Sequence, residues 1–216
     1  MASTGRFVVL EGGEGAGKST QAALLSAWMT QKGIAHRVVR EPGGTAVGEA
    51  IRSVVLGRTD LEMPPETELF LMLAARAAFV REVVRPALEA GEVVLADRFS
   101  LSTLAYQGYG RGLDLKAVRR AVELATGGLE PDVYVVLDVP VREGAARQRQ
   151  GGKNPDRIEG EGEDFLDRVR AGYLELSESE PRVRVIHGGG SPETVHGLIR
   201  RLLQSELPEP FGRAGV

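Results

Sequence analysis

The sequence contains no cysteine, so disulfides, thiolate metal sites and cysteine nucleophiles are all excluded. Histidine is also scarce, because only His36, His187 and His196 are present. None of the three lies at metal-ligand spacing from another, which argues against a histidine-rich zinc site. We therefore expect neither a cysteine nucleophile nor a metal site built from cysteines or histidines.

Long apolar segments and an excess of basic charge are missing as well. The apolar run at residues 7–10 has the length of a strand rather than of a signal peptide. Nothing approaches the roughly 18 apolar residues that a membrane span needs. The net charge of −3 does not favour binding to nucleic acid or to an anionic membrane. We therefore expect a cytoplasmic protein with neither partner.

The size and the overall composition are those of an ordinary globular protein. Hydrophobic residues make up 42% of the 216 residues and charged residues 26%, which excludes a wholly disordered chain. This length suits one domain, which we place at residues 1–205. Proline and glycine recur in residues 206–216, so a flexible C-terminal tail is expected there.

Short valine-rich runs alternate with longer helical patterns along the chain. Strands are predicted at residues 6–11, 36–40, 92–97, 133–138 and 183–187. Helices are predicted at about 18–32, 46–57, 65–89, 113–126, 140–150, 163–178 and 192–205, with Pro86 a candidate kink. The apolar strands are typical of strands covered on both faces, so the pattern predicts a three-layer α/β fold with a five-stranded parallel sheet.

Glycine and charged residues dominate residues 150–163, where Ile158 stands almost alone as an apolar side chain. Two interpretations are open for this segment. It is either a plain linker between two helices or a mobile lid that closes over a binding site.

The strongest local motif is G-x-x-x-x-G-K-[ST], which is followed by Thr20 and consists of Gly12, Gly13, Glu14, Gly15, Ala16, Gly17, Lys18 and Ser19. A predicted strand precedes it and a predicted helix follows, which is the context of a phosphate-binding loop, or P-loop. Backbone N–H groups and the helix dipole would hold a phosphate chain. Lys18 would reach the β- and γ-phosphates, and the Ser19 hydroxyl would bind Mg²⁺.

A triphosphate site does not name a reaction. The N-K-x-D motif of guanine-binding GTPases and the L-S-G-G-Q motif of transporter ATPases are both absent. A small-molecule kinase is the simplest interpretation of a short chain with a P-loop.

The strand at 92–97 ends in Asp97, and Arg98 follows. Ligands of open α/β sheets bind at the carboxyl ends of the strands. We therefore expect Asp97 to face Mg²⁺ through water and Arg98 to face a phosphate, with a plain strand-end salt bridge as the alternative. Asp138 ends another predicted strand without further marks and is interpreted as structural.

Six segments together resemble bacterial thymidylate kinase: FVVLEGGEGAGKST, REPGGT, ELFLMLAAR, ADRFSLSTLAYQGYGRG, PDVYVVLD and DRIE. The resemblance extends over residues 6–203. It implies a P-loop kinase fold and an enzyme that phosphorylates dTMP to dTDP with ATP and Mg²⁺, a step of dTTP synthesis. Members of the family are usually homodimers. Another nucleotide or deoxynucleoside kinase, or a noncatalytic ATP-binding switch protein, is the alternative.

The resemblance also implies a set of dTMP-binding residues, namely Glu14, Arg52, Met72, Arg76, Arg98, Thr103, Tyr106 and Gln107. In the family, the residues at the positions of Arg52 and Arg98 contact the dTMP phosphate. The residue matching Arg76 reads the thymine edge, and those matching Thr103 and Gln107 line the base and sugar.

Three of these matches have a particular meaning. Glu14 matches a carboxylate that binds the deoxyribose 3′-hydroxyl, and Tyr106 matches a ring that blocks a 2′-hydroxyl. Met72 departs from the family, which commonly stacks a phenylalanine on thymine at this position. A methionine can cover an aromatic face, but it is less rigid.

The catalytic cation remains to be placed. Gly15 stands where some thymidylate kinases carry an arginine, so Lys18 is the cation that the P-loop itself offers. Basic residues in or beside the lid are the candidates to replace it, namely Arg147, Arg149, Lys153 and Arg157. The alternative is that they are solvated surface charges.

Overall fold

The computed structural model describes residues 5–152 and 156–212. Its centre is a sheet of five strands: β1 (Arg6–Glu11), β2 (His36–Arg40), β3 (Val93–Asp97), β4 (Val133–Asp138) and β5 (Val183–His187). The order is β2-β3-β1-β4-β5, and every neighbouring pair is parallel. The predicted five-stranded parallel α/β fold is confirmed, and β3 begins one residue later than expected.

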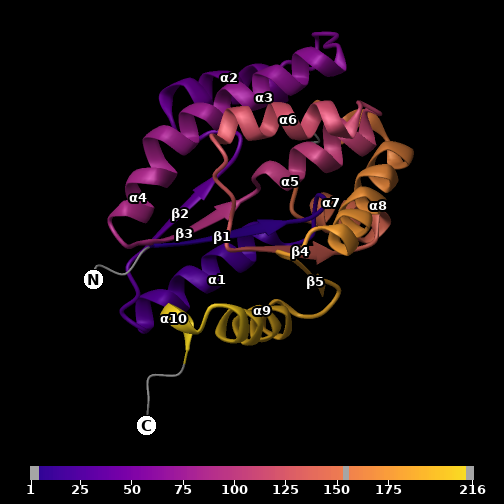
Figure 1. The fold of residues 1–216 in the computed structure, drawn as a ribbon. Helices are drawn as coiled ribbons and strands as arrows, with labels where there is room; N and C mark the ends of the chain where they lie inside the picture. Colours follow the sequence, from indigo (N-terminus) through magenta and orange to yellow (C-terminus); the bar gives the residue numbers. More distant parts are fainter. Residues whose placement is uncertain (1–4, 153–155, 213–216) are drawn as a thin grey trace.

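Helices surround this sheet on both faces (Figure 1). They are α1 (Lys18–Gln31), α2 (Ala46–Gly57), α3 (Pro65–Phe79), α4 (Arg85–Glu89), α5 (Ser100–Thr103), α6 (Leu115–Thr126), α7 (Val141–Gln150), α8 (Glu163–Ser179), α9 (Pro192–Glu206) and α10 (Pro208–Phe211). Two π-helical segments, η1 (Val80–Val84) and η2 (Leu104–Gly110), and the 3₁₀ turn η3 (Glu159–Glu161) complete them. No helix within the described residues is long and apolar enough to cross a membrane.

The two apolar layers follow from the alternation of side chains along each strand. In β1, Phe7 and Val9 pack into the layer under α3, α6 and α8. Val8 and Leu10 pack into the opposite layer, against α1 and α9. Figure 1 shows α2, α3 and α6 on one side of the sheet and α1 and α9 on the other. The central strands are therefore covered on both faces, as a parallel sheet requires.

The two edge strands differ from the expectation that all five are fully covered. Val38 in β2 is 44% exposed, and Val185 in β5 is 41% exposed. Each of these strands has a neighbour on one side only. Apolar composition alone did not separate the edge strands from the central ones.

The long helix predicted at 65–89 is three segments, α3, η1 and α4. The backbone N–H of Arg85 donates to the carbonyl of Val80, five residues earlier, which widens the turn. Pro86 has no N–H, and its ring crowds the carbonyl four residues before it in a regular helix. The π-helical turn therefore accommodates the proline within a continuous rod.

Residues 100–110 form α5 and η2, which the sequence analysis did not predict. Glycine is frequent here, and it normally weakens a helix. The two glycines here allow close packing. A Cβ on Gly108 would lie 2.5 Å from a Leu115 carbon, and one on Gly110 would lie 2.7 Å from the Phe165 ring. Neighbouring side chains thus take the space that larger residues would fill.

The tail expected to be flexible from residue 206 is packed over much of its length. Leu207 and Phe211 are buried, and the Phe211 ring stacks on Trp28 of α1 with centroids 5.6 Å apart. This contact closes the apolar layer between α1 and α9. The prediction is therefore wrong for residues 207–211, and residues 213–216 lie outside the described part of the chain.

Candidate active site

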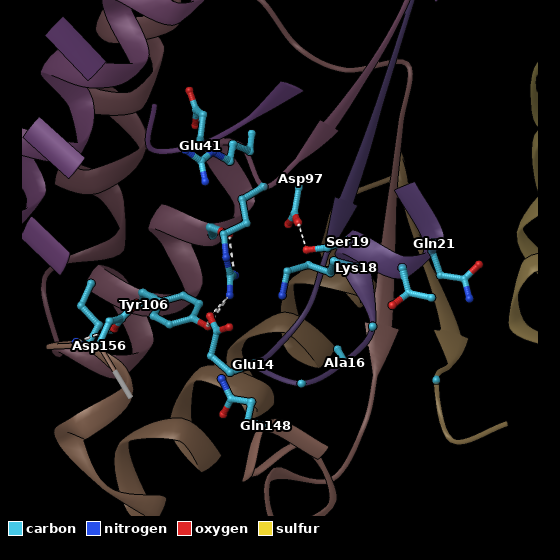
Figure 2. Close-up of a pocket in the computed structure, with 18 of the residues that line it drawn as sticks. Glu14, Ala16, Lys18, Ser19, Gln21, Glu41, Asp97, Tyr106, Gln148 and Asp156 are labelled. Atoms are coloured by element: carbon cyan, nitrogen blue, oxygen red, sulfur yellow. Dashed lines mark hydrogen bonds and ion pairs between the residues drawn. The ribbon is translucent and has the colours of Figure 1, made fainter. Parts of the chain in front are cut away.

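A cavity of about 620 Å³ opens where β1, β2 and β3 end. Figure 2 shows Lys18, Ser19 and Asp97 close together on one side of it, with Tyr106 pointing toward Glu14 on another. The predicted site residues that line it are Glu14, Gly15, Ala16, Gly17, Lys18, Ser19, Thr20, Arg52, Met72, Arg76, Asp97, Arg98, Thr103, Tyr106, Gln107 and Arg147. Residues far apart in the sequence therefore meet in one space.

The P-loop has the tight backbone that its glycines allow. Gly12 has a φ of 130°, and a Cβ there would lie 2.5 Å from the Leu137 carbonyl oxygen. Lys18 folds back into the loop, and its Nζ donates to the carbonyls of Gly12 at 3.0 Å and Gly13 at 2.8 Å. Burial and the nearby Arg98 lower the pKa of Lys18. Two buried cations at one loop favour an anionic ligand.

Ser19 and Asp97 form the candidate cation site. The Ser19 hydroxyl donates to Asp97 Oδ2 at 2.9 Å. Both groups offer oxygen, the ligand that Mg²⁺ prefers, and both line the cavity. No cluster of three or more acidic or histidine side chains that could hold a metal occurs in residues 5–152 and 156–212. These residues therefore fit a magnesium ion that takes its remaining ligands from phosphate and water.

Arg98 does not pair with its neighbour Asp97 but crosses to the P-loop. Its guanidinium forms an ion pair with Glu14 and donates to the Tyr106 hydroxyl at 3.0 Å. It also donates to the carbonyl of Gly12 at 3.0 Å. The residue has a φ of 75°, which is strained for an amino acid with a side chain. The strain is consistent with a backbone that is bent to place this cation in the cavity.

Glu11 is a structural anchor that the sequence analysis missed. It is fully buried and accepts hydrogen bonds from the backbone N–H of Phe99 at 2.9 Å and of Ser102 at 3.2 Å. The Tyr173 hydroxyl donates to it at 2.9 Å. Burial raises the pKa of Glu11, while Arg98 and these hydrogen bonds act in the opposite direction. The sequence offered one sign of this role, because Glu11 is a charged residue at the end of an otherwise apolar strand.

Arg76 on α3 is held in a fixed orientation at the other end of the cavity. Its Nε donates to Glu41 Oε2 at 2.8 Å, and its remaining nitrogens donate to Thr103 Oγ1 at 2.6 Å and to the Phe99 carbonyl at 3.0 Å. Met72 lies one helical turn earlier and also lines the cavity. Burial raises the pKa of Glu41, and the Arg76 charge opposes that rise. This arrangement suits recognition of a planar polar edge beside an apolar surface.

Gln107 and Arg157 meet at Glu68, a fully buried carboxylate of α3 that the sequence analysis did not single out. Gln107 Nε2 donates to Glu68 Oε1 at 2.8 Å, and the Arg157 guanidinium pairs with Glu68 Oε2. Arg157 Nε also donates to the Val55 carbonyl at 2.7 Å. The structure thus places Arg157 against α2 and α3 rather than beside the P-loop, because a buried acid there needs a partner.

The remaining candidates for the catalytic cation lie in different places. Arg147 lines the cavity and donates to the carbonyls of Gly15 at 3.4 Å and Gly188 at 3.0 Å. Arg149 is exposed on α7 and is not among the described residues that line the cavity. Lys153 lies outside the described residues.

Arg52 and several unpredicted residues complete the lining. Arg52 donates to the Pro42 carbonyl at 2.9 Å, which holds it beside the turn after β2. Gln21, Gln148 and Asp156 also line the cavity and are labelled in Figure 2. Asp156 begins the DRIE segment but was not predicted to line a cavity, and no motif marks Gln21 or Gln148.

Asp138 fits the structural interpretation. Arg170 Nε lies 2.7 Å from Asp138 Oδ1, and its terminal nitrogen lies 3.0 Å from Oδ2. The pair links the end of β4 to α8, and Asp138 is not among the described residues of the cavity lining.

Comparison with known proteins agrees with this geometry. The profile of the Thymidylate kinase family matches residues 10–199. The thymidylate kinase of Desulforudis audaxviator is 49% identical over 207 residues, 93% of each chain. That of Desulfovibrio desulfuricans is 48% identical over 93% of this chain and 96% of its own. The crystal structure of thymidylate kinase from Ehrlichia chaffeensis superposes with a TM-score of 0.75 at 27% identity, over 94% of this chain and 99% of that one. The chain is therefore a member of the thymidylate kinase family.

Proposed function

We propose that the protein phosphorylates dTMP to dTDP with ATP as the phosphoryl donor and Mg²⁺ as the cofactor. The observation that carries this function is that one cavity joins the P-loop, Glu14 included, to Tyr106, Arg76 and Gln107. A triphosphate and a nucleoside monophosphate can therefore meet end to end. Family membership supports the same reaction.

The nucleophile is an oxygen of the dTMP phosphate. The second pKa of a phosphate monoester is near 6, so the group is mostly a dianion at neutral pH and needs no general base. Its oxygen attacks the γ-phosphorus of ATP while the bond to the β–γ bridging oxygen breaks, and ADP leaves. The protein aligns the two phosphates and neutralises charge on the transferred group.

Four basic side chains from different elements share the neutralisation. Lys18 lies in the P-loop and binds the β- and γ-phosphates. Arg98 faces the acceptor phosphate from the end of β3, and Arg52 faces it from α2. Arg147 is the candidate for the transition-state cation, because it lines the cavity and bonds the Gly15 carbonyl of the P-loop. Ser19 and Asp97 would hold Mg²⁺, which when bound would supply further positive charge.

Nucleoside recognition is assigned to the opposite end of the cavity. Arg76 and Gln107 face the thymine edge, Thr103 holds Arg76, and Met72 covers the base. Glu14 binds the 3′-hydroxyl, and Tyr106 occupies the space that a 2′-hydroxyl would need. The Tyr106 hydroxyl lies 3.2 Å from Glu14 Oε1, which places the two sugar contacts side by side.

The deciding experiment is a coupled assay of ADP release with and without dTMP. Release that depends on dTMP, and dTDP as the product, would support the kinase. Lys18→Met should nearly abolish turnover and leave the fold intact by circular dichroism, since it removes the phosphate-binding ammonium. ATP binding without dTMP-dependent ADP release would favour a noncatalytic switch protein. Faster turnover of another nucleotide or of a deoxynucleoside would favour the other alternative.

We also propose a homodimer in the cytoplasm, as the family resemblance implies. Large apolar side chains on neighbouring helices support the dimer, since Phe70 of α3 is 64% exposed and Val47 of α2 is 53% exposed. Sedimentation equilibrium gives the mass in solution. A monomer at micromolar concentration would contradict the proposal, and Phe70→Asp should weaken a dimer that uses this face.

A further inference from the structure

Gln107 presents an amide to the cavity, and the two ends of an amide are chemically different. Nε2 can only donate hydrogen bonds, and Oε1 can only accept them. Gln107 is buried, and it lines the cavity beside Met72 and Arg76. The end that faces a ligand therefore decides which groups the ligand must carry.

Glu68 fixes the direction of this amide. Gln107 Nε2 donates to Glu68 Oε1 at 2.8 Å. An ionised carboxylate only accepts hydrogen bonds, so the reversed amide would place two acceptor oxygens in contact. It would also leave Glu68 Oε1 with the longer hydrogen bond from Arg111 Nε, at 3.2 Å, in place of two donors. Nε2 is therefore held at Glu68, and Oε1 is the acceptor that Gln107 can present to a ligand.

Two arginines keep Glu68 in its ionised form. Arg111 donates to it through Nε at 3.2 Å and through a terminal nitrogen at 2.8 Å, and Arg157 pairs with Oε2. Burial by itself would raise the pKa of Glu68, but the hydrogen bonds from Arg111, Gln107 and Arg157 outweigh it and lower the pKa. The carboxylate is therefore a permanent acceptor at neutral pH.

Both arginines are themselves held in place. Arg111 pairs at 2.7 Å with Glu161, the last residue of η3. The backbone N–H of Arg157 donates to the Leu56 carbonyl at 3.1 Å, at the end of α2. Gln107, Arg111 and Arg157 thus converge on the carboxylate of Glu68, and carbonyls of α2 hold Arg157 there.

We propose that Glu68 is a positioning residue that sets base specificity through Gln107. With Oε1 turned to the base, the site accepts a hydrogen bond from the N3–H of thymine or uracil. Cytosine has an unprotonated N3, so two acceptors would face each other and cytosine would be rejected. This inference rests on the proposed function, in which dTMP is the phosphoryl acceptor.

The test uses Glu68→Gln, whose side-chain amide can accept from Nε2 of Gln107 or donate to Oε1 of a reversed Gln107, so that it no longer fixes the direction. The inhibition constants of dUMP and dCMP are measured in competition with dTMP. Uracil shares the N3–H of thymine and lacks only the methyl group. We expect the preference for dUMP over dCMP to fall by about tenfold or more, because a polar site discriminates strongly only while its groups are fixed. The preference for dTMP over dUMP should stay within about twofold, since a methyl contact does not depend on the amide.

Each outcome then has one meaning. A folded variant that keeps the wild-type preference for dUMP over dCMP overturns the role of Glu68. Equal losses in both preferences also overturn it, since they indicate general loosening of the cavity. A wild-type protein that does not phosphorylate dTMP overturns the proposed function instead.

A second variant keeps the test decisive if Glu68→Gln does not fold. Its expected weakness is an unpaired, buried Arg157. The double variant Glu68→Gln with Arg157→Met removes that charge, while Arg111 keeps Glu161 as a partner. Arg157→Met alone retains Glu68 and serves as the control. The double variant should lose the preference for dUMP over dCMP and the control should retain it; the same preference in both variants would contradict the proposal.

Discussion

The hydroxyl of Ser19, in the first turn of α1, lies 2.9 Å from Oδ2 of Asp97 at the end of β3. This hydrogen bond joins the P-loop helix to the strand beside β1. It brings together two oxygen groups that are 78 positions apart in the chain. The carboxylate is therefore within reach of an ion bound at the serine.

Asp97→Asn should lower kcat by about 10²-fold at saturating Mg²⁺, because the amide holds the hydrated ion less well and phosphate alignment suffers. Titration of activity with Mg²⁺ should show a higher half-saturating concentration. Asp138→Asn is the matched control, as the same change at the end of β4 lies outside the described cavity lining. Equal effects of the two substitutions would argue against a metal role for Asp97.

Arg147→Ala should lower kcat by at least about 10²-fold, because a cation on the transferred phosphoryl group contributes roughly 10³–10⁵ in rate. The KM for dTMP should change little, since the contact strengthens in the transition state. Arg149→Ala should have a much smaller effect, as this side chain is exposed on α7. Steady-state kinetics of both variants checks the assignment, and a larger loss in Arg149→Ala would reverse it.

Tyr106→Ala should relax discrimination against the ribonucleotide more than it weakens dTMP binding, because in the proposed site the ring occupies the space that a 2′-hydroxyl would need. Tyr106→Phe keeps the ring and removes only the hydroxyl that contacts Arg98 and Glu14. It should therefore preserve most of the discrimination. The measurement is the ratio of kcat/KM for the deoxy and ribo substrates. An unchanged ratio in the alanine variant would show that the ring merely packs.

The stability of the protein should depend on Glu68 in acid. The pKa of Glu68 in the folded protein lies below its ordinary value of 4.5, so its contribution is fully present above pH 4.5. The contribution is lost as the pH falls through the folded-state pKa, because the unfolded chain binds the proton first. Urea unfolding is measured from pH 7 to pH 3. The free energy of unfolding should fall less steeply toward acid pH in Glu68→Gln than in the wild type. Glu82→Gln, an exposed change, should keep the wild-type slope.

Phe211→Ala should reduce the free energy of unfolding by about 3 kcal/mol, because it removes a fully buried ring from the layer between α1 and α9. Trp28 is the only tryptophan of the chain and stacks on Phe211, so its emission reports the change directly. Leu124→Ala is the control, at a side chain that is 85% exposed. An unfolding free energy and emission spectrum like those of the wild type would show that the C-terminal packing is dispensable.

Short segments of the sequence were enough to predict the strands and the P-loop. The strand, the glycine-rich loop and the helix start of the P-loop are consecutive, so the sequence alone predicted Lys18 and Ser19 as phosphate- and metal-binding candidates. The valine-rich runs likewise predicted all five strands, since period and composition are properties of short segments. The tail was mispredicted because its prolines and glycine were visible, while the distant partner of Phe211 was not.

The tertiary structure decided which of the candidate arginines line the cavity. Arg147 and Arg149 are two positions apart, and on a helix such residues point in nearly opposite directions. Composition cannot tell which one faces the P-loop, because that depends on how α7 is rotated against it. Glu68 and Gln107 are separated by 39 positions, and their pairing arises only when η2 packs beside α3. The sequence therefore shows which residue types are present. Which side chains pair, and which way each one points, is decided only when the helices pack against one another.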